Sequence, residues 1–592
     1  MSTLGLSSFD HDTAAALLQD GRITAAIEND KLARTSTQGL PQAAIHFCLQ
    51  QAKTNWEQMA VVAVASSALR GWSRELWCDA RLARTTPFAS AYHQLNAMGE
   101  LKRNWDHLRA LRGLSSGKAR LVTLDHHLCH AASAFYASPF ERALIVTMDE
   151  DGDGCSGLLA IGEGTRIRVL RRIPFPNSLA WLYSRITELA GFVPHKEEHK
   201  TQWLGMAGEP EFKALLLEMM TSSRSPIPRL DHRFARRGLD RRLSLSPEFS
   251  RRAGLPSDSR ELTEQQRQSL ACSVQDACYE VVAKIVEDLQ KQHGDLPVCF
   301  AGGLFQNSLL VACLEQKPGI RQVFVPPAPG NSGTAIGAAY LAWHEVLHQP
   351  RVEPVSSPYW GPRFSHQQTK DVLDNCKARY WLQTTDDRKV ETAIRLLEAG
   401  KIVGWVQGAA EFGPRALGNR SVLASPWAPY VKENLNDFIK HREWFRPFAI
   451  SVPEEDCSQC FEASQQCQYM NSLGTVRPGS VSLPEGFILP GGRVRLHVVK
   501  KESNPLLWRL LKTFGKSGPA PMLVNTSFNL FSESLVVTPR DAVRSYFCSG
   551  IDSLFINNFV LAKSSAAHLL EADSVKQFRN KALSPTLSPA AS

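Results

Sequence analysis

Length, composition and charge set the first limits on this sequence. The chain has 592 residues, 43% hydrophobic and 21% charged, with a formal net charge of +9, so we expect at least two domains with separate cores and no strong attraction to nucleic acid. No apolar run approaches the roughly 18–20 residues of a membrane span. The start lacks the segments of a secretion signal, and 13 scattered cysteines indicate reduced thiols, which together predict a cytoplasmic protein without membrane contact.

The first 30 residues are typical of three short strands. The apolar runs LGLSSF, AAALL and RITAAIE are separated by a polar bend at 10–13, which includes His11, and by an Asp-Gly turn. The apolar run 143–149 repeats this plan, because it ends in an acidic, glycine-rich loop and a further hairpin follows. Two related halves predict an α/β fold with a duplicated actin/Hsp70-like architecture over residues 1–350, in which a nucleotide lies between the lobes.

Two histidines and a carboxylate form the first candidate site. His126 and His130 are four residues apart, so on a helix they share one face, and Asp149 ends the apolar run that follows. Two imidazoles and a carboxylate suit a divalent metal that keeps open positions. Taken alone, the same histidines are somewhat more typical of helix caps or satisfied polar groups.

Glycine-rich turns mark the end of the first domain. A strand, a glycine pair and a helix are predicted over 297–316, and Gly302 and Gly303 would let backbone amides approach an anion at the helix N-terminus, with Asn307 as a further nucleotide-binding candidate. Residues 323–343 repeat this strand, loop and helix plan.

Composition also indicates an insertion, a linker and a tail. The arginine-rich segment 229–252 is consistent with a nucleic-acid patch but favours a solvated helical insertion. Residues 351–368 are rich in proline and polar residues and read as a linker. A second α/β domain is predicted for 369–592, with a disordered tail from about 575.

The second domain concentrates cations near predicted strands. We interpret them as a phosphate or nucleotide site in which side chains replace a phosphate-binding loop, because no GxxxxGK[ST] motif is present. In an extended KHREWFR segment, alternate residues would point to one face. The alternative is a set of surface ion pairs. The candidates are Arg415, Arg420, Lys440, Arg442, Arg446, Ser527 and Asn529.

Seven motifs in order carry a family resemblance. They are HHLCHAASAFYASPF, EEHKTQWLGMAGEP, CFAGGLFQNS, PAPGNSGTAIGAA, EFGPRALGNRS, KHREWFRPFA and NTSFN with TPRDA. Over roughly residues 3–563 the sequence resembles the O-carbamoyltransferases of the nodulation and antibiotic type. The resemblance implies a YrdC-like C-terminal domain and an N-terminal domain related to the tRNA threonylcarbamoyl transferases.

The same resemblance implies an enzyme with two steps. ATP, with Mg²⁺, and carbamoyl phosphate would give carbamoyl-adenylate in the C-terminal domain, and the N-terminal domain would pass the carbamoyl group to a hydroxyl of a small natural-product acceptor. Lys440, Arg442, Ser527 and Asn529 match the family's KxR and SxN positions, and Arg415 lies beside them. The expected metal is Fe²⁺ or a similar divalent ion, with ligands at His126, His130, Asp149 and Asn331.

Departures from the family pattern leave alternatives open. Asn331 and Thr35 stand where the family usually has an aspartate ligand and a basic residue. We take His11 as the candidate base for the acceptor hydroxyl, with a turn-stabilising hydrogen bond as the alternative. Other hypotheses are a tRNA-modifying carbamoyl transferase and a carbamoyl-phosphate- or nucleotide-binding protein with a degenerate transfer site. No feature specifies the oligomeric state, for which a homodimer is a working hypothesis.

Overall fold

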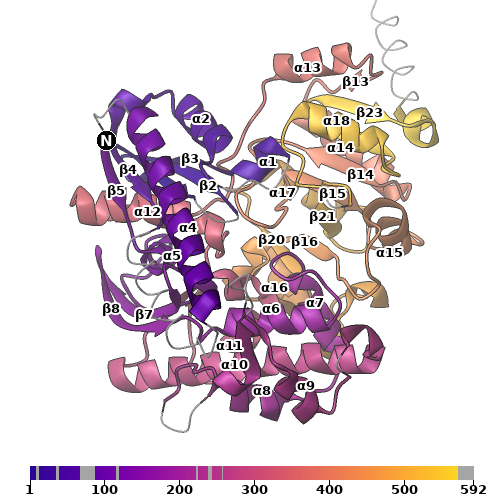
Figure 1. Ribbon diagram of the computed structural model, residues 1–592. Coiled ribbons are helices and arrows are strands. Elements are labelled where there is room, and N and C mark those ends of the chain that lie inside the picture. The colour runs from indigo at the N-terminus through magenta and orange to yellow at the C-terminus, as the bar shows by residue number, and fades with distance from the viewer. Residues whose placement is uncertain are drawn as a thin grey trace, which may run out of the picture.

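The three strands expected at the N-terminus lie side by side in one sheet of the computed structural model (Figure 1). The structure describes residues 1–8, 12–34, 39–66, 87–114, 119–221, 225–237, 243–256, 258–531 and 533–570. His11 and Thr35 lie outside the described residues, so the predictions that concern them stay predictions.

The first sheet has the strand order β3-β2-β1-β4-β5. β1, β2 and β3 are antiparallel, whereas β4 and β5 run parallel to β1. Asp20 and Gly21 connect β2 to β3 and both have positive φ angles, of 49° and 79°, as a two-residue hairpin turn requires. The strands are β1 (Ser2–Ser7), β2 (Ala14–Gln19), β3 (Arg22–Glu28), β4 (Met59–Val64) and β5 (Arg120–Thr123).

The second sheet repeats the connectivity of the first. Its order is β12-β11-β6-β7-β8, with β6, β7 and β8 antiparallel and β11 and β12 parallel to β6. The predicted α/β fold with an actin-like duplicated half is therefore confirmed. The strands are β6 (Arg142–Gly152), β7 (Cys155–Glu163), β8 (Arg166–Pro174), β11 (Val298–Ala301) and β12 (Val323–Phe324).

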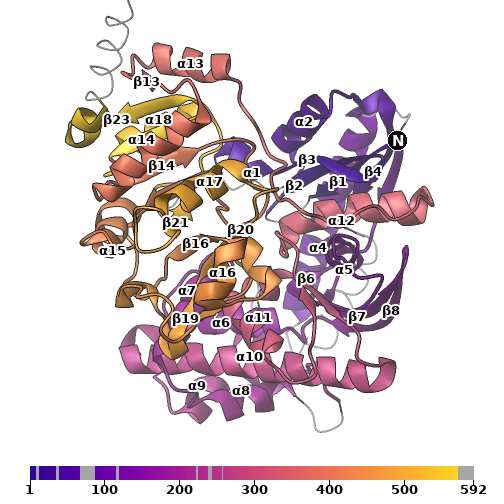
Figure 2. The same cartoon turned by 180° about the vertical axis from the view of Figure 1, so that it is seen from behind.

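Two helices rich in small residues lie between these sheets, α5 (His126–Phe135) and α12 (Thr334–Leu341) (Figure 2). A Cβ atom on Gly337 would lie 1.8 Å from the Cys129 carbonyl oxygen, so α12 approaches α5 more closely than a side chain would allow. The core around them is built largely from alanines of both lobes. This close packing fixes the position of α5, which carries both candidate histidine ligands.

Helices cover the outer face of the second lobe. The longest, α10, begins at a complete capping box formed by Thr263 and Gln266. The helices of this lobe are α6 (Leu179–Leu189), α7 (Glu198–Leu204), α8 (Lys213–Met220), α10 (Glu264–His293) and α11 (Ser308–Glu315). The first lobe adds α1 (Asn29–Ala33), α2 (Gln42–Gln51) and α4 (Pro87–Leu114).

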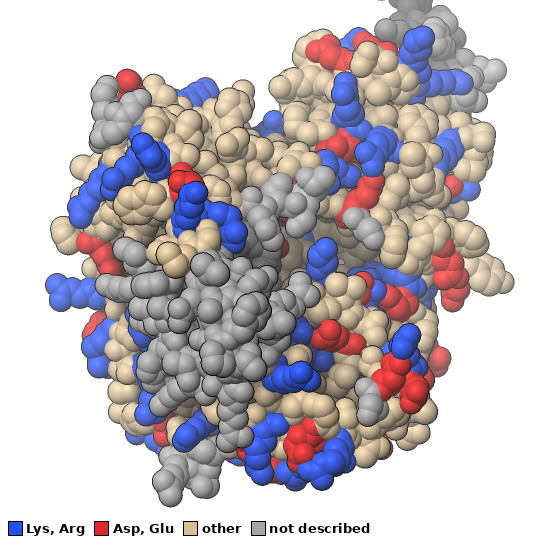
Figure 3. All heavy atoms as spheres, viewed as in Figure 1, with Lys and Arg blue, Asp and Glu red and all other residues tan. Residues whose placement is uncertain are grey.

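The arginine-rich insertion differs from its prediction. Its described residues form two antiparallel strands, β9 (Ala235–Arg237) and β10 (Leu243–Leu245), with one turn of 3-10 helix at His232–Phe234 and the short helix α9 (Pro247–Ala253). Arg252 pairs with Glu218, at 2.5 Å, and Arg251 forms an ion pair with Glu248. On the face shown in Figure 3, charges of both signs are interspersed.

The C-terminal half contains a sheet of eight strands in the order β13-β23-β22-β14-β15-β21-β16-β20. Separate apolar cores lie on its two faces, one under α14 (Asp386–Glu398) and α17 (Pro505–Phe514), the other under α13 (His366–Asn375) and α18 (Pro539–Phe547). The strands are β13 (Trp381–Leu382), β14 (Val403–Val406), β15 (Arg420–Ala424), β16 (Ala449–Pro453), β20 (Leu496–Val499), β21 (Leu523–Ser527), β22 (Ser553–Ile556) and β23 (Phe559–Ala562).

A small sheet and two short helices complete this half. The small sheet contains β17 (Phe461–Glu462), β18 (Gly474–Val476) and β19 (Arg493–Val494), and the helices are α15 (Val431–Glu433) and α16 (Glu454–Cys460). Residues 351–365, most of the predicted linker, have neither helix nor strand. Among the helices of the described residues, none has the length and apolar character that a membrane span needs.

The contact between α12 and α5 gives the first prediction. A Gly337→Val substitution should lower the free energy of unfolding by about 1–3 kcal/mol or more, because its side chain must displace the Cys129 backbone. Urea unfolding followed by circular dichroism measures this change. Gly113→Ala is the control: nothing lies within 4 Å of a Cβ there, so stability should stay the same or rise slightly. Equal stability of wild type and Gly337→Val would contradict the packing described.

Candidate functional site

One cavity of about 1310 Å³ lies between the N-terminal and C-terminal halves. Its walls bring together residues that are far apart in the sequence, several of which were sequence candidates. The N-terminal half contributes Asp12, Asp149, Gly303, Asn307 and Asn331, and the C-terminal half contributes Arg415, Arg442, Arg446, Arg495 and Ser527.

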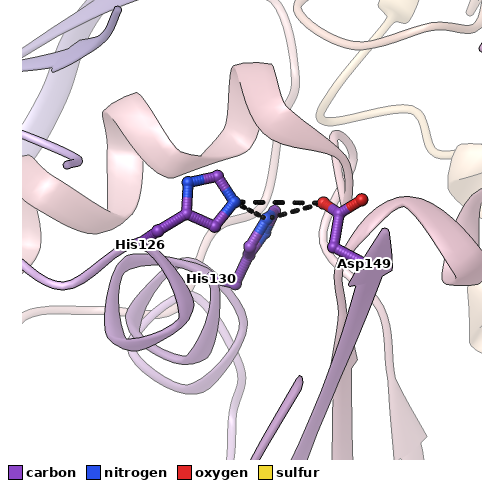
Figure 4. Close-up of side chains that lie close together, drawn as sticks. All are labelled: His126, His130 and Asp149. Atoms are coloured by element: carbon purple, nitrogen blue, oxygen red, sulfur yellow. Dashed lines mark hydrogen bonds and ion pairs between the residues drawn. The ribbon is translucent and has the colours of Figure 1, made fainter. Parts of the chain in front are cut away.

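At the N-terminal end, His126, His130 and Asp149 converge as predicted (Figure 4). His130 Nε2 lies 3.1 Å from His126 Nε2 and 3.1 Å from Asp149 Oδ2, and His126 Nε2 lies 4.0 Å from the same oxygen. Donor atoms at roughly 2.0–2.2 Å from a shared ion are separated by about 3–3.5 Å. Small adjustments of these side chains would let all three hold one divalent metal. We call these residues the His–Asp cluster.

The surrounding backbone fixes the two histidines. Asp125 caps α5 by accepting a hydrogen bond from the Leu128 amide (3.0 Å), and it is held in turn by Arg172. The Asp153 carboxylate accepts a hydrogen bond from the His126 amide (3.0 Å). Gly152 leaves room for the His126 ring, since a Cβ there would lie 2.1 Å from its Cδ2.

Electrostatics prepares the cluster for a cation. Burial alone would raise the pKa of Asp149, but hydrogen bonds from His126 and His130 outweigh it and hold that pKa well below its ordinary value. Burial lowers the pKa of His130. An ionised carboxylate beside a neutral imidazole is the protonation state that metal ligation requires.

Asn331 lies beside the cluster, as its place in the resemblance implies. Its side chain is within hydrogen-bonding range of His130, and the residue is 8% exposed at the cavity wall. An asparagine side chain offers a neutral oxygen where an aspartate would add a negative charge. Asn331 therefore fits a fourth-ligand position that binds a cation more weakly.

The glycine pair has a packing role. Gly302 has φ 100°, and a Cβ there would lie 2.1 Å from the Met148 carbonyl oxygen, so the pair lets its turn press against the end of β6 beside Asp149. The Gly302 amide donates to the Pro329 carbonyl oxygen (2.7 Å), which corrects its predicted contact with an anion. Gly303 lines the cavity, as does Asn307, whose side chain caps α11 and bonds to Gln275.

The opposite end of the cavity is cationic. Its basic side chains lie close enough for the charges of several to lower one another's pKa values. We call them the cationic cluster: Arg415, Arg442, Arg446 and Arg495, which line the cavity, and Lys440, which is near Arg442 and Arg446 but is not among the described residues of the wall.

Lys440 meets the two polar residues that were predicted beside it. Its Nζ donates to Asn529 Oδ1 (2.8 Å) and contacts the carbonyl oxygen and hydroxyl of Ser527. The Ser527 hydroxyl donates to Asn529 Oδ1 (2.7 Å). Burial and the neighbouring arginines hold the pKa of Lys440 well below its ordinary value.

The local backbone here differs from the extended segment that was predicted. Residues 434–440 are helical with a wide turn, and His441 reverses the chain with φ 43°. The two cations are thus directed by a helix end and a left-handed residue instead of by strand alternation. Arg442 lies over the Phe448 ring (3.9 Å to the centroid), and its Nε donates to Asn436 (2.8 Å).

Arg415 is positioned by a buried carboxylate in the EFGPRALGNRS motif. Glu411 is 0% exposed, and one of its oxygens accepts backbone hydrogen bonds from Leu417, Asn419 and Arg420, which folds the loop tightly around it. Arg415 then reaches across the interface and donates to the Gln306 carbonyl oxygen (2.8 Å).

Arg420 requires a correction. Its guanidinium is 1% exposed and donates to the carbonyl oxygens of Gln407 and Pro362, among others, at 2.8 and 3.0 Å. It is not among the described residues of the cavity wall. Because its donors are engaged inside the C-terminal half, Arg420 stabilises the EFGPRALGNRS loop and does not face a phosphate.

Arg495 and His199 are charged or titratable residues of the cavity wall that were not among the sequence candidates. Arg495 precedes β20, and its buried Nε has no hydrogen-bond partner among the described residues. His199 opens α7, and burial beside Arg446 and Arg415 lowers its pKa to about 2, so it is neutral. For Arg495, the available signal in the sequence was an arginine within the apolar run RVRLHVV. For His199, it was the EEHK motif.

The fold and the site define a two-part α/β enzyme, with a His–Asp cluster in an actin-like half and a cationic cluster in the other. Comparison with known proteins agrees. The Carbamoyltransferase N-terminus model matches residues 2–340 and the Carbamoyltransferase C-terminus model matches residues 394–563. The chain belongs to the carbamoyltransferase family.

Named relatives include O-carbamoyltransferases. The chain is 32% identical to nodulation protein NolNO of Sinorhizobium fredii, over 95% of this chain and 80% of the relative. It is 30% identical to the 3'-hydroxymethylcephem-O-carbamoyltransferase of Amycolatopsis lactamdurans, over 47% and 51%. A solved structure of HypF from T. kodakarensis aligns over 57% of this chain and 46% of that chain, at 10% identity and a TM-score of 0.32.

The position of Asn331 gives a prediction about metal affinity. Asn331→Asp should tighten binding of Fe²⁺ or Mn²⁺ roughly tenfold or more, because it adds one negative charge beside His130. Calorimetric titration of the metal into anaerobic protein measures this without any assay of activity. Asn307→Asp, which places the same charge elsewhere on the cavity wall, should leave the affinity nearly unchanged. Equal affinity in wild type and Asn331→Asp would remove this residue from the ligand set.

Proposed function

We propose that this enzyme is an ATP-dependent O-carbamoyltransferase that uses carbamoyl phosphate. It forms carbamoyl-adenylate and transfers the carbamoyl group to a hydroxyl of a small natural-product acceptor. The observation that carries the proposal is one cavity lined at one end by arginines of the cationic cluster and at the other by Asp149 of the His–Asp cluster. Family membership supplies the carbamoyl chemistry.

The cationic cluster supports the anionic donor and ATP. Among the described residues, Arg446 has an ion pair, with Glu443 at 3.6 Å, whereas the other members have none with a carboxylate. Arg442 Nη2 and Arg495 Nε are buried without a hydrogen-bond partner in the described part of the chain. Unpaired buried guanidinium nitrogens are costly, and phosphate oxygens would satisfy them with the right geometry.

The first step makes the activated carbamoyl group. Carbamoyl phosphate and ATP give carbamoyl-adenylate, and mass balance with one water requires release of both pyrophosphate and phosphate. Cations fixed around the reacting phosphates stabilise the charge that moves to the leaving oxygen. Lys440 is held by Ser527 and Asn529, so it is oriented before the substrate enters.

In the second step, which we place at the His–Asp cluster, the acceptor hydroxyl oxygen attacks the carbamoyl carbon and AMP leaves. A divalent ion such as Fe²⁺, bound by His126, His130 and Asp149 with Asn331 beside them, would act as a Lewis acid toward the carbamoyl oxygen. The ionised Asp149 accepts a hydrogen bond from His130 Nε2, and this contact orients the ring whose nitrogen would bind the ion once that proton is lost. His11 stays our candidate for taking the proton of the acceptor hydroxyl.

The shared cavity supports a protected route between the two steps. A mixed anhydride such as carbamoyl-adenylate hydrolyses readily in water, so an enclosed path preserves it. Arg415 and Gln306 join the two halves along this path.

A second candidate is a carbamoyl-phosphate- or nucleotide-binding protein with a degenerate transfer site. The observation that favours it is Asn331, which lacks the charge of an aspartate beside the His–Asp cluster. Such a protein would release pyrophosphate yet carbamoylate no acceptor.

Two substitutions should separate the steps. Arg442→Ala should reduce carbamoyl-phosphate-dependent pyrophosphate release by roughly 100-fold or more, because a charged phosphate contact is lost. His130→Ala should leave that release near the wild-type rate while blocking carbamoylation of an acceptor hydroxyl and lowering bound metal. Pyrophosphate detection and mass spectrometry of the acceptor measure the two steps.

Surface variants control for general damage. Arg509→Ala removes an arginine paired with Asp387 at the surface, and His366→Ala removes an exposed histidine of α13; neither should change either step. An equal loss of both steps in His130→Ala would contradict the division of labour. Pyrophosphate release by wild type without product across a broad acceptor panel would favour the second candidate.

A further inference from the structure

Asn525 is a buried amide on the wall of the same cavity. It lies in β21, is 2% exposed and precedes Ser527 by two residues. Residues two apart on a strand share a face, so Asn525 and Ser527 present their side chains on the same side of β21. Asn525 was not among the residues that the sequence singled out.

Three acceptors fix the orientation of this amide. Its Nδ2 lies within hydrogen-bonding distance of Ser451 Oγ (3.0 Å), His497 Nδ1 (3.2 Å) and the Ala416 carbonyl oxygen (3.4 Å), so its two hydrogens have acceptors inside the protein. A carbonyl oxygen can only accept, so the atom that faces Ala416 is the NH₂ group. Burial lowers the pKa of His497 to about 3, which keeps its ring neutral and able to accept.

The carbonyl end of the same amide is left unsatisfied. Asn525 Oδ1 is buried and has no hydrogen-bond partner among the described residues. Buried acceptors in folded proteins are rarely left without a donor. A ligand in the cavity can supply this donor.

The neighbours of Asn525 restrict the chemistry of that ligand. Lysine and arginine side chains carry donors and no acceptor, so the cationic cluster binds oxygen anions but cannot read an N–H group. A ligand that satisfies both features is an anion with an N–H donor close to its charge. Carbamoyl phosphate fits, since its NH₂ is separated from the phosphate by the carbonyl carbon and one oxygen. The amine of ATP lies at the far end of the molecule from the phosphates.

We propose that Asn525 Oδ1 accepts a hydrogen bond from the NH₂ group of carbamoyl phosphate. Asn525 is then the specificity-determining residue that distinguishes the carbamoyl group from an acetyl group, which has a methyl in the same place. Ser451 and His497 are positioning residues that hold the amide with its oxygen toward the ligand. This inference rests on the proposed use of carbamoyl phosphate.

The test compares carbamoyl phosphate, as substrate, with acetyl phosphate, as inhibitor, in full-length wild type and Asn525→Leu. Pyrophosphate release gives KM for carbamoyl phosphate and for ATP, and acetyl phosphate is titrated as an inhibitor to give its Ki. We expect KM for carbamoyl phosphate to rise roughly tenfold or more, while KM for ATP and Ki for acetyl phosphate stay within about twofold. Asn471→Leu, which removes another buried amide that bonds to Val325 and Pro326, should not change the ratio of the two donor constants.

The remaining outcomes overturn the inference. An unchanged KM for carbamoyl phosphate would show that Asn525 does not recognise this substrate. A rise confined to KM for ATP would show that Asn525 Oδ1 binds the adenine amine instead. Equal weakening of carbamoyl phosphate and acetyl phosphate indicates a structural role. If Asn525→Leu does not fold, Ser451→Ala must show a smaller rise in the ratio of KM for carbamoyl phosphate to Ki for acetyl phosphate. Wild type that releases no pyrophosphate with carbamoyl phosphate overturns the proposed function, and with it the ligand assigned to Asn525.

Discussion

Buried positive charge at the junction of two halves is the constraint on which this structure depends. Arg442 and Arg495 each have a buried nitrogen without a partner in the described part of the chain, and Lys440 is satisfied by neutral oxygens. Such a cluster is expensive to desolvate and is partly self-repelling, as the lowered pKa of Arg442, about 9, reflects. An anionic ligand relieves both costs, so stability and substrate binding are coupled at this site.

The interface holds this charge in register with the His–Asp cluster through a few buried contacts. Lys31 pairs with Glu28 (2.9 Å) and donates to the Gly413 carbonyl oxygen (2.8 Å), while Glu28 accepts from the Gly413 amide (2.6 Å). Glu411 organises the rest of that loop. The EFGPRALGNRS loop thus binds the N-terminal half through these hydrogen bonds and places Arg415 at the cavity. These contacts set the distance between the cationic cluster and the His–Asp cluster.

Local patterns predicted most of the fold and the first site. The Asp-Gly turn, the strand repeats and the four-residue spacing of His126 and His130 are short-range features, and the structure has them where expected. Long-range packing decided the rest. KHREWFR alternates like a strand, yet its first residue ends a helix because that helix packs its apolar side on the C-terminal core. Arg420 resembles a phosphate ligand in sequence, but the backbone carbonyls that engage it come from distant segments. The partner of a buried polar atom, as for Asn525, is invisible to any local pattern.

Equilibrium unfolding of wild type and Arg442→Met, with and without carbamoyl phosphate, measures whether the buried cations are held for this anion. Methionine keeps an apolar stem under Phe448 but removes the charge. We expect carbamoyl phosphate to stabilise wild type saturably, by about 2.7 kcal/mol at 100 times its Kd. Most of this gain should be lost in the variant, which should be at least as stable as wild type without ligand. Equal stabilisation of both proteins, or none of wild type, would contradict the claim that these buried cations are held for this anion.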